Sequence, residues 1–476
     1  MKKITFIFFL LTQIIFAQTP CIDGFAGEYP CNDYDLMSHI SNATLGNLST
    51  AGNDSWGWTD PDTQKEYALM GIDTGIVFID ISNPIEPIII GTLSSSTVSS
   101  SWRDVKVYNS HAFIVSEANS HGMQVFDLRR LRNPSNAIIP FTADTTFTGF
   151  GSAHNIVINE ESGYAYIVGA SRSSTYGGGP IFINIQDPVN PVIEGGFAEG
   201  GYSHDAQVIT YSGPDTDYTN KEILIGSNEN EIVIADVTDK TNPIVISTIS
   251  YSNVKYAHQG WFTDDLKYFI LGDEQDELKI GNKTRSIIFD FTDLDNPVYH
   301  FDYFGNTNAI DHNGYVKDNV YYQANYTGGV RMIDVSNIAT KSFSEIGFFD
   351  TYPNNDNADF NGVWNVYPYF PSGNIIVSDI DNGFFVIRKS GTLNVAPKKA
   401  LTNFSVFPNP AKSQTTITIG NNKIIESVQV YSILGQKIID KKNLKQPKYI
   451  LKTAILNKGI YLIKINGKMT KKFIIE

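Results

Sequence analysis

Short runs of apolar, β-branched and aromatic residues recur along most of the chain, and each run ends in polar, turn-forming residues. The first clear example is Gly75–Asp80, with the sequence GIVFID, which is followed by Ser82, Asn83 and Pro84. Such runs favour a buried strand, and the Asn-Pro pair prevents the strand from continuing. The pattern returns at residues 122–127, 180–184, 232–236, 287–290, 329–334 and 383–388. Successive copies end 44 to 57 residues apart, and an all-strand repeat of this length is typical of a β-propeller.

Each repeat also holds enough strands for one propeller blade. In the unit spanning residues 203–250, strands are predicted at 206–210, 222–226, 231–237 and 243–250. Short loops join them, so they should form an antiparallel meander. Seven signature strands therefore predict an all-β, seven-bladed propeller over residues 46–388.

The last predicted blade has no fourth strand, because a polar segment follows Arg388 directly. A ring of blades must close to remove its sheet edges. We therefore predict that Tyr34–Ile40, in an N-terminal segment covering residues 18–45, pairs with the strand at 384–388.

The end of the chain follows a different strand pattern. After a polar linker at residues 389–402, short alternating strands are predicted at 404–407, 415–419, 427–431, 436–439, 449–452, 461–465 and 472–475. Seven short strands in one compact segment predict a small Ig-like β-sandwich at residues 403–476.

The N-terminus indicates export. Residues 1–17 combine two lysines with an apolar run and end in Ala17, as a secretory signal peptide does. The run is too short to span a membrane, so no transmembrane segment is expected in the mature chain. Cys21 and Cys31 are the only cysteines, and an exported chain meets oxidising conditions. We therefore predict a disulfide between them.

The net charge of −14 is unevenly distributed. Residues 396–476 contain 15 Lys, no Arg and three acidic residues, a net charge of +12, so the rest of the chain carries −26. The strong negative charge of residues 1–395 argues against a nucleic-acid partner and is compatible with cation binding or simple solubility. The charge break also marks the C-terminal segment as a separate unit.

A second repeated position lies at the entry to the first strand of each unit. Four consecutive units have a histidine there, and aligned units supply other polar or aromatic residues. The candidate residues are Trp56, Arg103, Asp104, His154, His204, Asp205, His258, Gln259, His312, Asn313 and Trp364. First strands line the central channel of a propeller, so we expect these residues around one mouth of that channel.

This set has several interpretations. Imidazoles and carboxylates that converge at a channel mouth could bind a divalent metal, Ca²⁺ or Zn²⁺, or an anionic or sugar-like ligand. The metal candidates are His154, His204, His258 and His312. The interpretation we favour here is structural: the same residues can hydrogen-bond the loop of the neighbouring blade. No catalytic residue is predicted, because the sequence lacks a nucleophile elbow, a His-Glu-x-x-His motif and a phosphate loop.

Oxygen-rich loops form a third repeated position, after the second strand of several units. They lie at residues 116–119, 227–230, 272–277, 324–325 and 378–381. Such donors suit Ca²⁺. None of the loops has the spacing of an established calcium site, so solvated turns are the favoured interpretation.

Motifs in the C-terminal segment resemble those of a known family. They are NFSVFPNPA at 403–411, VQVYSILGQK at 428–437, GIYLIK at 459–464 and KKFIIE at 471–476. The segment is similar to the C-terminal sorting domain, type A, of the type IX secretion system. That resemblance implies handling by the type IX machinery, passage through the outer membrane of a Gram-negative bacterium, and release or surface attachment.

Residues 21–388 also resemble a known family. CIDGFAGEYPC at 21–31, NDSWGW at 53–58, WRDVKV at 102–107, GSAHNIV at 151–157, YSHDAQ at 202–207, HQGW at 258–261 and DHNGY at 311–315 carry the similarity. This part of the chain looks like the choice-of-anchor B family, whose propeller is built from LVIVD repeats. The resemblance implies export and surface display, and it supplies no activity.

Taken together, the sequence predicts a secreted or cell-surface propeller that acts as a non-enzymatic binding or adhesion module. A surface glycan or a protein is the expected ligand. The alternative is a metal-dependent extracellular enzyme, hydrolase-like, with its site at the histidine-lined mouth.

Overall fold

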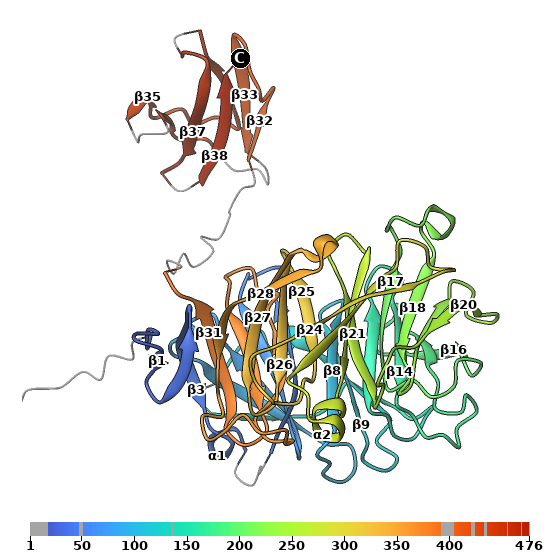
Figure 1. Cartoon of the computed structure of the whole chain (residues 1–476). Helices are drawn as coiled ribbons and strands as arrows, with labels where there is room; N and C mark the ends of the chain where they lie inside the picture. The colour runs from blue at the N-terminus through green and yellow to red at the C-terminus, as the bar shows by residue number, and fades with distance from the viewer. Residues whose placement is uncertain are drawn as a thin grey trace, which may run out of the picture. The chain divides into compact units, whose positions relative to one another are not determined.

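The computed structural model describes residues 18–46, 51–135, 137–391, 404–419, 424–432, 436–454, 456–467 and 469–475. The predicted signal peptide and most of the predicted linker lie outside the described residues. The chain divides into two compact units, Met1–Asn394 and Val395–Glu476 (Figure 1). None of the helices in the described part of the chain has the length and apolar character needed to cross a bilayer.

The first unit is a seven-bladed β-propeller. The first blade contains β4 to β7 (Gly52–Thr59, Glu66–Ile72, Gly75–Asp80 and Ile88–Ser94), and the second contains β8, β9, β10 and β12 (Arg103–Tyr108, His111–Ser116, Met123–Asp127 and Thr145–Phe147). The third contains β13 to β16 (Asn155–Asn159, Tyr164–Val168, Ile181–Asn184 and Val192–Gly196). The fourth contains β17 to β20 (Asp205–Thr210, Glu222–Ser227, Ile232–Asp236 and Ile244–Ile249). Blades five to seven comprise β21 to β24 (Ala257–Phe262, Tyr268–Asp273, Arg285–Asp290 and Val298–Phe304), β25 to β28 (Gly314–Lys317, Val320–Asn325, Gly329–Asn337 and Ser342–Phe349), and β29 to β31 with β3 (Val363–Tyr367, Ile375–Asp379, Gly383–Lys389 and Tyr34–Ile40). The first strand of each blade contacts that of the next, and β29 contacts β4, which closes the ring.

The signature strands are the third strands of the blades, and they form the core between neighbouring blades. All six residues of β6 are buried. The Phe78 ring from β6 stacks on Phe126 from β10 with centroids 4.5 Å apart. A strand covered on both faces needs apolar residues at every position, which explains the continuous apolar runs in the sequence.

The aspartates that end the signature strands form turns. The side chain of Asp80 accepts a hydrogen bond from the backbone N–H of Ser82 at 2.9 Å. Asp236 accepts one from Thr238 and Asp334 one from Ser336, each at 2.9 Å. These are Asx turns, in which the side chain replaces a backbone acceptor two residues before the donor.

An N-terminal strand closes the ring. β3 pairs antiparallel with β31, with Tyr34 opposite Lys389 and Ile40 opposite Phe384, and the two strands lie side by side in Figure 1. This is the pairing that ring closure predicted. The preceding strands β1 (Phe25–Ala26) and β2 (Tyr29–Asn32) extend the sixth blade, because β2 pairs with β28. The sequence analysis did not predict that extension.

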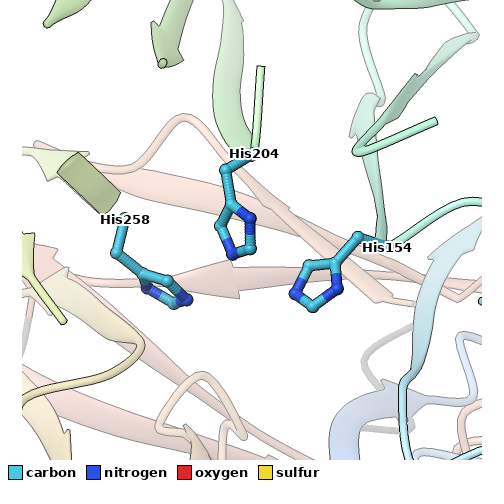
Figure 2. A group of neighbouring side chains, drawn as sticks. All are labelled: His154, His204 and His258. Carbon is cyan, nitrogen blue, oxygen red and sulfur yellow. The ribbon is translucent and has the colours of Figure 1, made fainter. Parts of the chain in front are cut away.

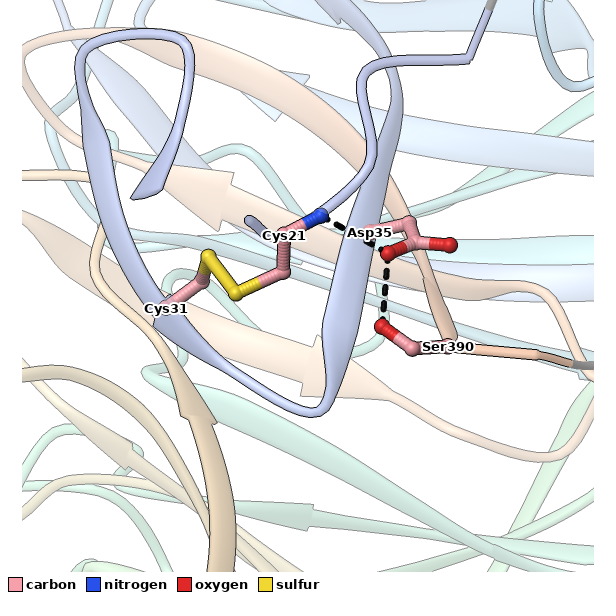
Figure 3. The surroundings of a disulfide bond; sticks show 4 residues. All are labelled: Cys21, Cys31, Asp35 and Ser390. Atoms are coloured by element: carbon pink, nitrogen blue, oxygen red, sulfur yellow. Dashed lines mark hydrogen bonds between the residues drawn. A yellow bond between two sulfur atoms is a disulfide. The ribbon is translucent and has the colours of Figure 1, made fainter. Parts of the chain in front are cut away.

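The predicted disulfide is present and lies beside this closing strand (Figure 3). Cys21 and Cys31 are bonded to each other. Asp35 of β3 accepts hydrogen bonds from the backbone N–H of Cys21 at 2.9 Å and from Ser390 Oγ at 2.6 Å. One buried carboxylate therefore joins the N-terminal loop to the residue that directly follows β31.

The first unit also contains a short additional strand and two short helices. β11 (Ile139–Phe141) adds to the outer strand of the first blade in parallel orientation. Two short helices, α1 (Asn42–Leu45) and α2 (Asp276–Ile280), occur in connections between strands.

The second unit is a β-sandwich of seven strands, as predicted. One sheet contains β32 (Phe404–Phe407), β33 (Gln414–Ile419) and β36 (Lys448–Lys452), and the other contains β34 (Val428–Ser432), β35 (Lys437–Lys441), β37 (Gly459–Ile465) and β38 (Met469–Ile475). Their inward-facing residues, among them Ile417, Val430 and Ile463, form a separate core.

Candidate functional site

Four histidines from consecutive blades line a cavity of about 570 Å³ at one end of the inner strands. His154 and His204 directly precede β13 and β17, His258 lies in β21, and His312 lies two residues before β25. Because the blades are structural repeats, one sequence position per blade places these four rings in an arc. Neighbouring ring centroids along the arc are 4.3, 4.6 and 4.5 Å apart.

Three of these imidazoles point toward a common centre (Figure 2). They belong to His154, His204 and His258, which are 9%, 6% and 2% exposed. One ligand atom from each lies within 4.8 Å of the other two. His258 forms a second such group with Glu274 and His312.

Hydrogen bonds hold three of the rings through Nδ1. His154 Nδ1 lies 2.6 Å from Glu117 Oε1, and His312 Nδ1 lies 2.6 Å from the carbonyl oxygen of Trp364. His204 Nδ1 lies 2.9 Å from the hydroxyl of Tyr256. A carboxylate and a carbonyl can only accept, so His154 and His312 donate from Nδ1. In the neutral form of each ring the lone pair is then on Nε2.

Burial favours the uncharged form of His204, His258 and His312. Desolvation lowers the pKa of His204 and His258 well below the ordinary value, and the neighbouring imidazoles act in the same direction. The pKa of His312 is lowered to about 3, again mainly by burial. Neutral imidazole is the form that binds metals and accepts hydrogen bonds.

Glu274 provides a carboxyl group beside the arc. Its Oε1 is 3.9 Å from His258 Nε2 and 3.7 Å from His312 Nε2, and it accepts a hydrogen bond of 2.7 Å from the Tyr326 hydroxyl. Burial raises the pKa of Glu274 to about 7.

Asp104, which follows Arg103, and Gln259, which follows His258, have a structural role. Asp104 Oδ2 accepts a hydrogen bond from the backbone N–H of Ile156 at 2.8 Å, and Gln259 Oε1 accepts one from Gly314 at 2.9 Å. Both bonds join adjacent blades. At these two positions a polar side chain links one blade to the first strand of the next.

The candidate residues do not form one site, which corrects the sequence-based expectation of a single cluster. His154, His204, His258, His312 and Trp364 line the cavity described above, which we call the histidine pocket. Trp56, Asp205, Gln259 and Asn313 line a separate cavity of about 50 Å³ further along the inner strands. Successive side chains of a strand point in opposite directions, so a histidine and the residue after it do not face the same cavity. Burial raises the pKa of Asp205 to about 7.

Two candidates at the second blade also lie away from the histidine pocket. Arg103 is 2% exposed, and its Nη1 lies 3.0 Å from His121 Nε2. Asp104 Oδ1 lies 2.5 Å from Lys106 Nζ, and Lys106 lines the smaller cavity.

Several residues of the histidine pocket are not among the candidates predicted from the sequence. Glu117 and Glu274 come from the oxygen-rich loops after second strands, which were interpreted as solvated turns or calcium loops, yet both side chains contact histidines. Aligning the second and third repeated positions at the same end of the blades could have revealed this convergence. The aromatic residues Tyr202, Tyr256, Tyr326 and Phe360 also line the pocket.

Comparison with known proteins identifies the C-terminal unit. Residues 405–476 match the family model of the secretion system C-terminal sorting domain. The chain thus carries a type IX sorting domain, which indicates export to the cell surface or secretion. A search of curated proteins finds no match.

Three solved structures show distant similarity. PorZ, a surface component of the type IX secretion system of Porphyromonas gingivalis, is 11% identical with a TM-score of 0.43, and the match covers 89% of this chain and 59% of PorZ. The Cps50 (Swd1) β-propeller domain from Myceliophteria thermophila is 7% identical with a TM-score of 0.45, over 68% of this chain and 93% of that one. A protein from Lactobacillus plantarum is 10% identical with a TM-score of 0.42, over 85% and 100%. At these identities and TM-scores, none of the similarities bears on function.

Proposed function

We propose that this protein is an exported propeller that binds a neutral glycan in the histidine pocket, as a non-enzymatic binding module. The composition of the pocket wall is the observation that carries the proposal. Aromatic side chains from several blades surround the cavity: Trp102, Tyr202, Tyr256, Tyr326, Phe360 and Trp364. Trp102 and Phe360 are 46% and 43% exposed, so their rings are accessible to a ligand.

This wall suits a sugar ring better than an anion. Tyr and Trp present an apolar face together with a polar group, and ligand pockets combine such faces with a few placed hydrogen-bonding groups. Glu117 and Glu274 are the only Asp or Glu residues among the described residues that line the pocket, and no Lys or Arg lines it. An anionic polymer would meet carboxylates there without a compensating cation.

The export route supports a role outside the cell. A sorting domain delivers the propeller to the surface or the medium, where glycans are abundant ligands. We further propose that residues 21–388 belong to the choice-of-anchor B family with LVIVD repeats. The motifs at 53–58 and 202–207 support this, since they include residues of the inner strands.

A glycan array probed with the purified protein tests the binding proposal. We expect binding to neutral glycans, and an affinity at least about tenfold lower after Phe360→Ala or Trp102→Ala, because covering an exposed side chain such as Phe contributes about 1.5–3 kcal/mol. Tyr299→Ala is the matched control, since Tyr299 is 49% exposed on the outer strand of the fifth blade. Equal binding by parent and pocket variants would show that the glycan binds elsewhere.

A metal-dependent extracellular hydrolase is the second candidate function. Three imidazoles directed at an open cavity resemble the ligand set of catalytic zinc sites, which leave one coordination position for water or substrate. Assays with ester, peptide and glycoside substrates, with and without added Zn²⁺, separate the two functions. Turnover that disappears on chelation supports the enzyme, whereas glycan binding without turnover supports the binding module.

A further inference from the structure

We propose that His154, His204 and His258 bind one divalent transition-metal ion, with Zn²⁺ as the ion to test. The proposal goes beyond glycan binding, which needs no metal.

The geometry of the three side chains carries the first part of the argument. They come from three consecutive blades, and their ligand atoms lie within 4.8 Å of one another (Figure 2). Zinc binds imidazole nitrogen at about 2.0–2.1 Å, so two ligands of a tetrahedral ion are about 3.4 Å apart. The three nitrogens must approach one another to that spacing when an ion binds.

Hydrogen bonds behind the rings orient them as in known metal sites. A metal-binding histidine usually donates its other ring N–H to a carboxylate, carbonyl or hydroxyl, which fixes the ring and raises its basicity. His154 has this arrangement with Glu117, at 2.6 Å, and His204 has a comparable one with the Tyr256 hydroxyl, at 2.9 Å. His154 therefore has Nε2 available for a ligand, and His204 has Nε2 available when its Nδ1 donates to the hydroxyl.

An unpartnered buried nitrogen is the independent second observation. His204 Nε2 has no hydrogen-bond partner in the described structure, although the residue is only 6% exposed. Buried polar atoms nearly always have a partner. An ion at the centre of the three rings would satisfy this atom.

The donor set decides the class of metal. Nitrogen ligands select Zn²⁺, Cu²⁺ or Ni²⁺ over Ca²⁺, which requires six to eight oxygen ligands. Glu274 groups with His258 and His312 instead, so the fourth position of an ion at His154, His204 and His258 is left to water or a ligand. The pocket therefore favours zinc over the calcium that the oxygen-rich loops suggested.

Metal binding by the full-length purified chain tests the proposal. After EDTA treatment and dialysis, the protein is titrated with ZnCl₂, and bound metal is measured together with the unfolding temperature. We expect one tightly bound Zn²⁺ per chain and a Zn²⁺-dependent rise in unfolding temperature. His154→Ala and His204→Ala should each weaken binding at least about 100-fold, because losing a ligand should cost more than the roughly 10–100-fold lost with an outer-shell partner.

Two matched controls locate the ion. His312→Ala removes a histidine that belongs only to the competing group with His258 and Glu274, and should retain zinc. His300→Ala, on the outer strand of the fifth blade, controls for adventitious surface binding. The absence of stoichiometric zinc in the parent protein would overturn the proposal, and so would loss of zinc in His312→Ala with retention in His204→Ala.

A second measurement distinguishes lost ligands from lost folding. The unfolding temperature of each variant in EDTA reports its fold without metal, and His204→Gln replaces the ring should the alanine variant fail to fold. Co²⁺ bound to the parent protein should give visible ligand-field bands that are absent in His204→Gln. Identical Co²⁺ spectra in the two proteins would rule out His204 as a ligand. Neither result depends on glycan binding, so the metal site and the proposed function can fail separately.

Discussion

His121 is a buried histidine outside the histidine pocket, and its hydrogen bonds make it sensitive to acid. It is 0% exposed, its Nδ1 lies 3.0 Å from the carbonyl oxygen of Gly122, and its Nε2 lies 3.0 Å from Arg103 Nη1. The ring thus donates from Nδ1 and accepts from the guanidinium at Nε2. Burial lowers the pKa of His121 to about 4, and the Arg103 charge acts in the same direction. A proton on Nε2 would have to displace the hydrogen bond from Arg103.

This residue predicts a loss of stability in acid. The unfolded chain binds the proton with a pKa of about 6.5, above the folded value, so stability is complete above pH 6.5 and falls as the pH drops toward 4. His121→Gln removes the titration while keeping an acceptor for Arg103. Between pH 6.5 and 4 the free energy of unfolding of the parent should fall more steeply than that of the variant, by up to about 1.4 kcal/mol per pH unit. Urea denaturation at several pH values measures both slopes, and equal slopes would contradict the prediction.

Lys106 predicts a second effect at the scale of single residues. Its ammonium lies 2.5 Å from Asp104 and 3.9 Å from Asp54, and the three side chains are 15%, 2% and 3% exposed. Lys106→Met leaves two buried carboxylates without their cation, which should destabilise the propeller by about 3–5 kcal/mol. Adding Asp104→Asn removes one of these charges, so the double variant should recover at least about 1 kcal/mol of the loss. Denaturation midpoints of the parent, the two single variants Lys106→Met and Asp104→Asn, and the double variant give the coupling energy. Strictly additive effects would contradict a direct ion pair.

The sequence located the histidines but not their partners. His154, His204, His258 and His312 occupy one position of the repeat, so the ring geometry of a propeller was enough to bring them together. Glu117 and Glu274 lie in loops after second strands, where side-chain direction depends on the local turn and cannot be inferred from strand alternation. The histidine pocket and the smaller cavity were not separated either, because the sequence-based expectation placed each histidine and the residue after it at one mouth without applying strand alternation to them.

At the scale of secondary-structure elements, the closing strand β3 determines whether the propeller forms a ring. Its partner β31 is about 350 residues away in the chain, with Tyr34 opposite Lys389. The blade repeat revealed that a strand was missing, which is why this distant pairing could be predicted. The extension of the sixth blade by β1 and β2 left no such gap in the repeat, so no sequence pattern indicated it.

Asp35 should be a major contributor to this closure. Its carboxylate accepts the hydrogen bonds from Cys21 and Ser390 described above and a third hydrogen bond, of 2.5 Å, from Gln18 Nε2. Asp35 is 4% exposed. Asp35→Ala removes all three bonds, and hydrogen bonds to a charged group contribute about 1.5–3 kcal/mol each before relaxation. We expect a loss of about 2–4 kcal/mol and faster proteolysis of the N-terminal segment.

Asp33→Asn is the matched control for that variant. It removes the same charge two residues earlier, where the side chain is 45% exposed and forms a 3.6 Å ion pair with Lys389. Surface ion pairs of this kind contribute about 0–1 kcal/mol. Limited proteolysis and thermal unfolding compare the two variants, and an equal effect of both would exclude Asp35 as the specific link between the chain's N-terminal loop and β31.

At the scale of the whole molecule, the two units differ in charge, core and role. The C-terminal segment carries +12 and the rest −26, and the sandwich has a hydrophobic core of its own. The propeller ring is closed by β3 and β31, both within the first unit, and requires no strand from the sorting domain. The fold therefore predicts that one truncation between the two units abolishes export and leaves the stability of the propeller unchanged.

A chain ending at Asn394 tests this separation. Since each unit buries its own core, the truncated protein should unfold within about 2 °C of the propeller transition in the full chain, a shift equivalent to less than about 1 kcal/mol for a domain of this size. It should keep any zinc and glycan binding of the propeller, because the described residues that line the histidine pocket all belong to the first unit. Without residues 405–476 it should remain inside the cell envelope, whereas a carrier protein fused to residues 395–476 should be exported. Cell fractionation, calorimetry and zinc titration measure these three outcomes. Export of the truncated chain would show that the sorting domain is dispensable, and a large fall in its unfolding temperature would show that the propeller depends on the second unit.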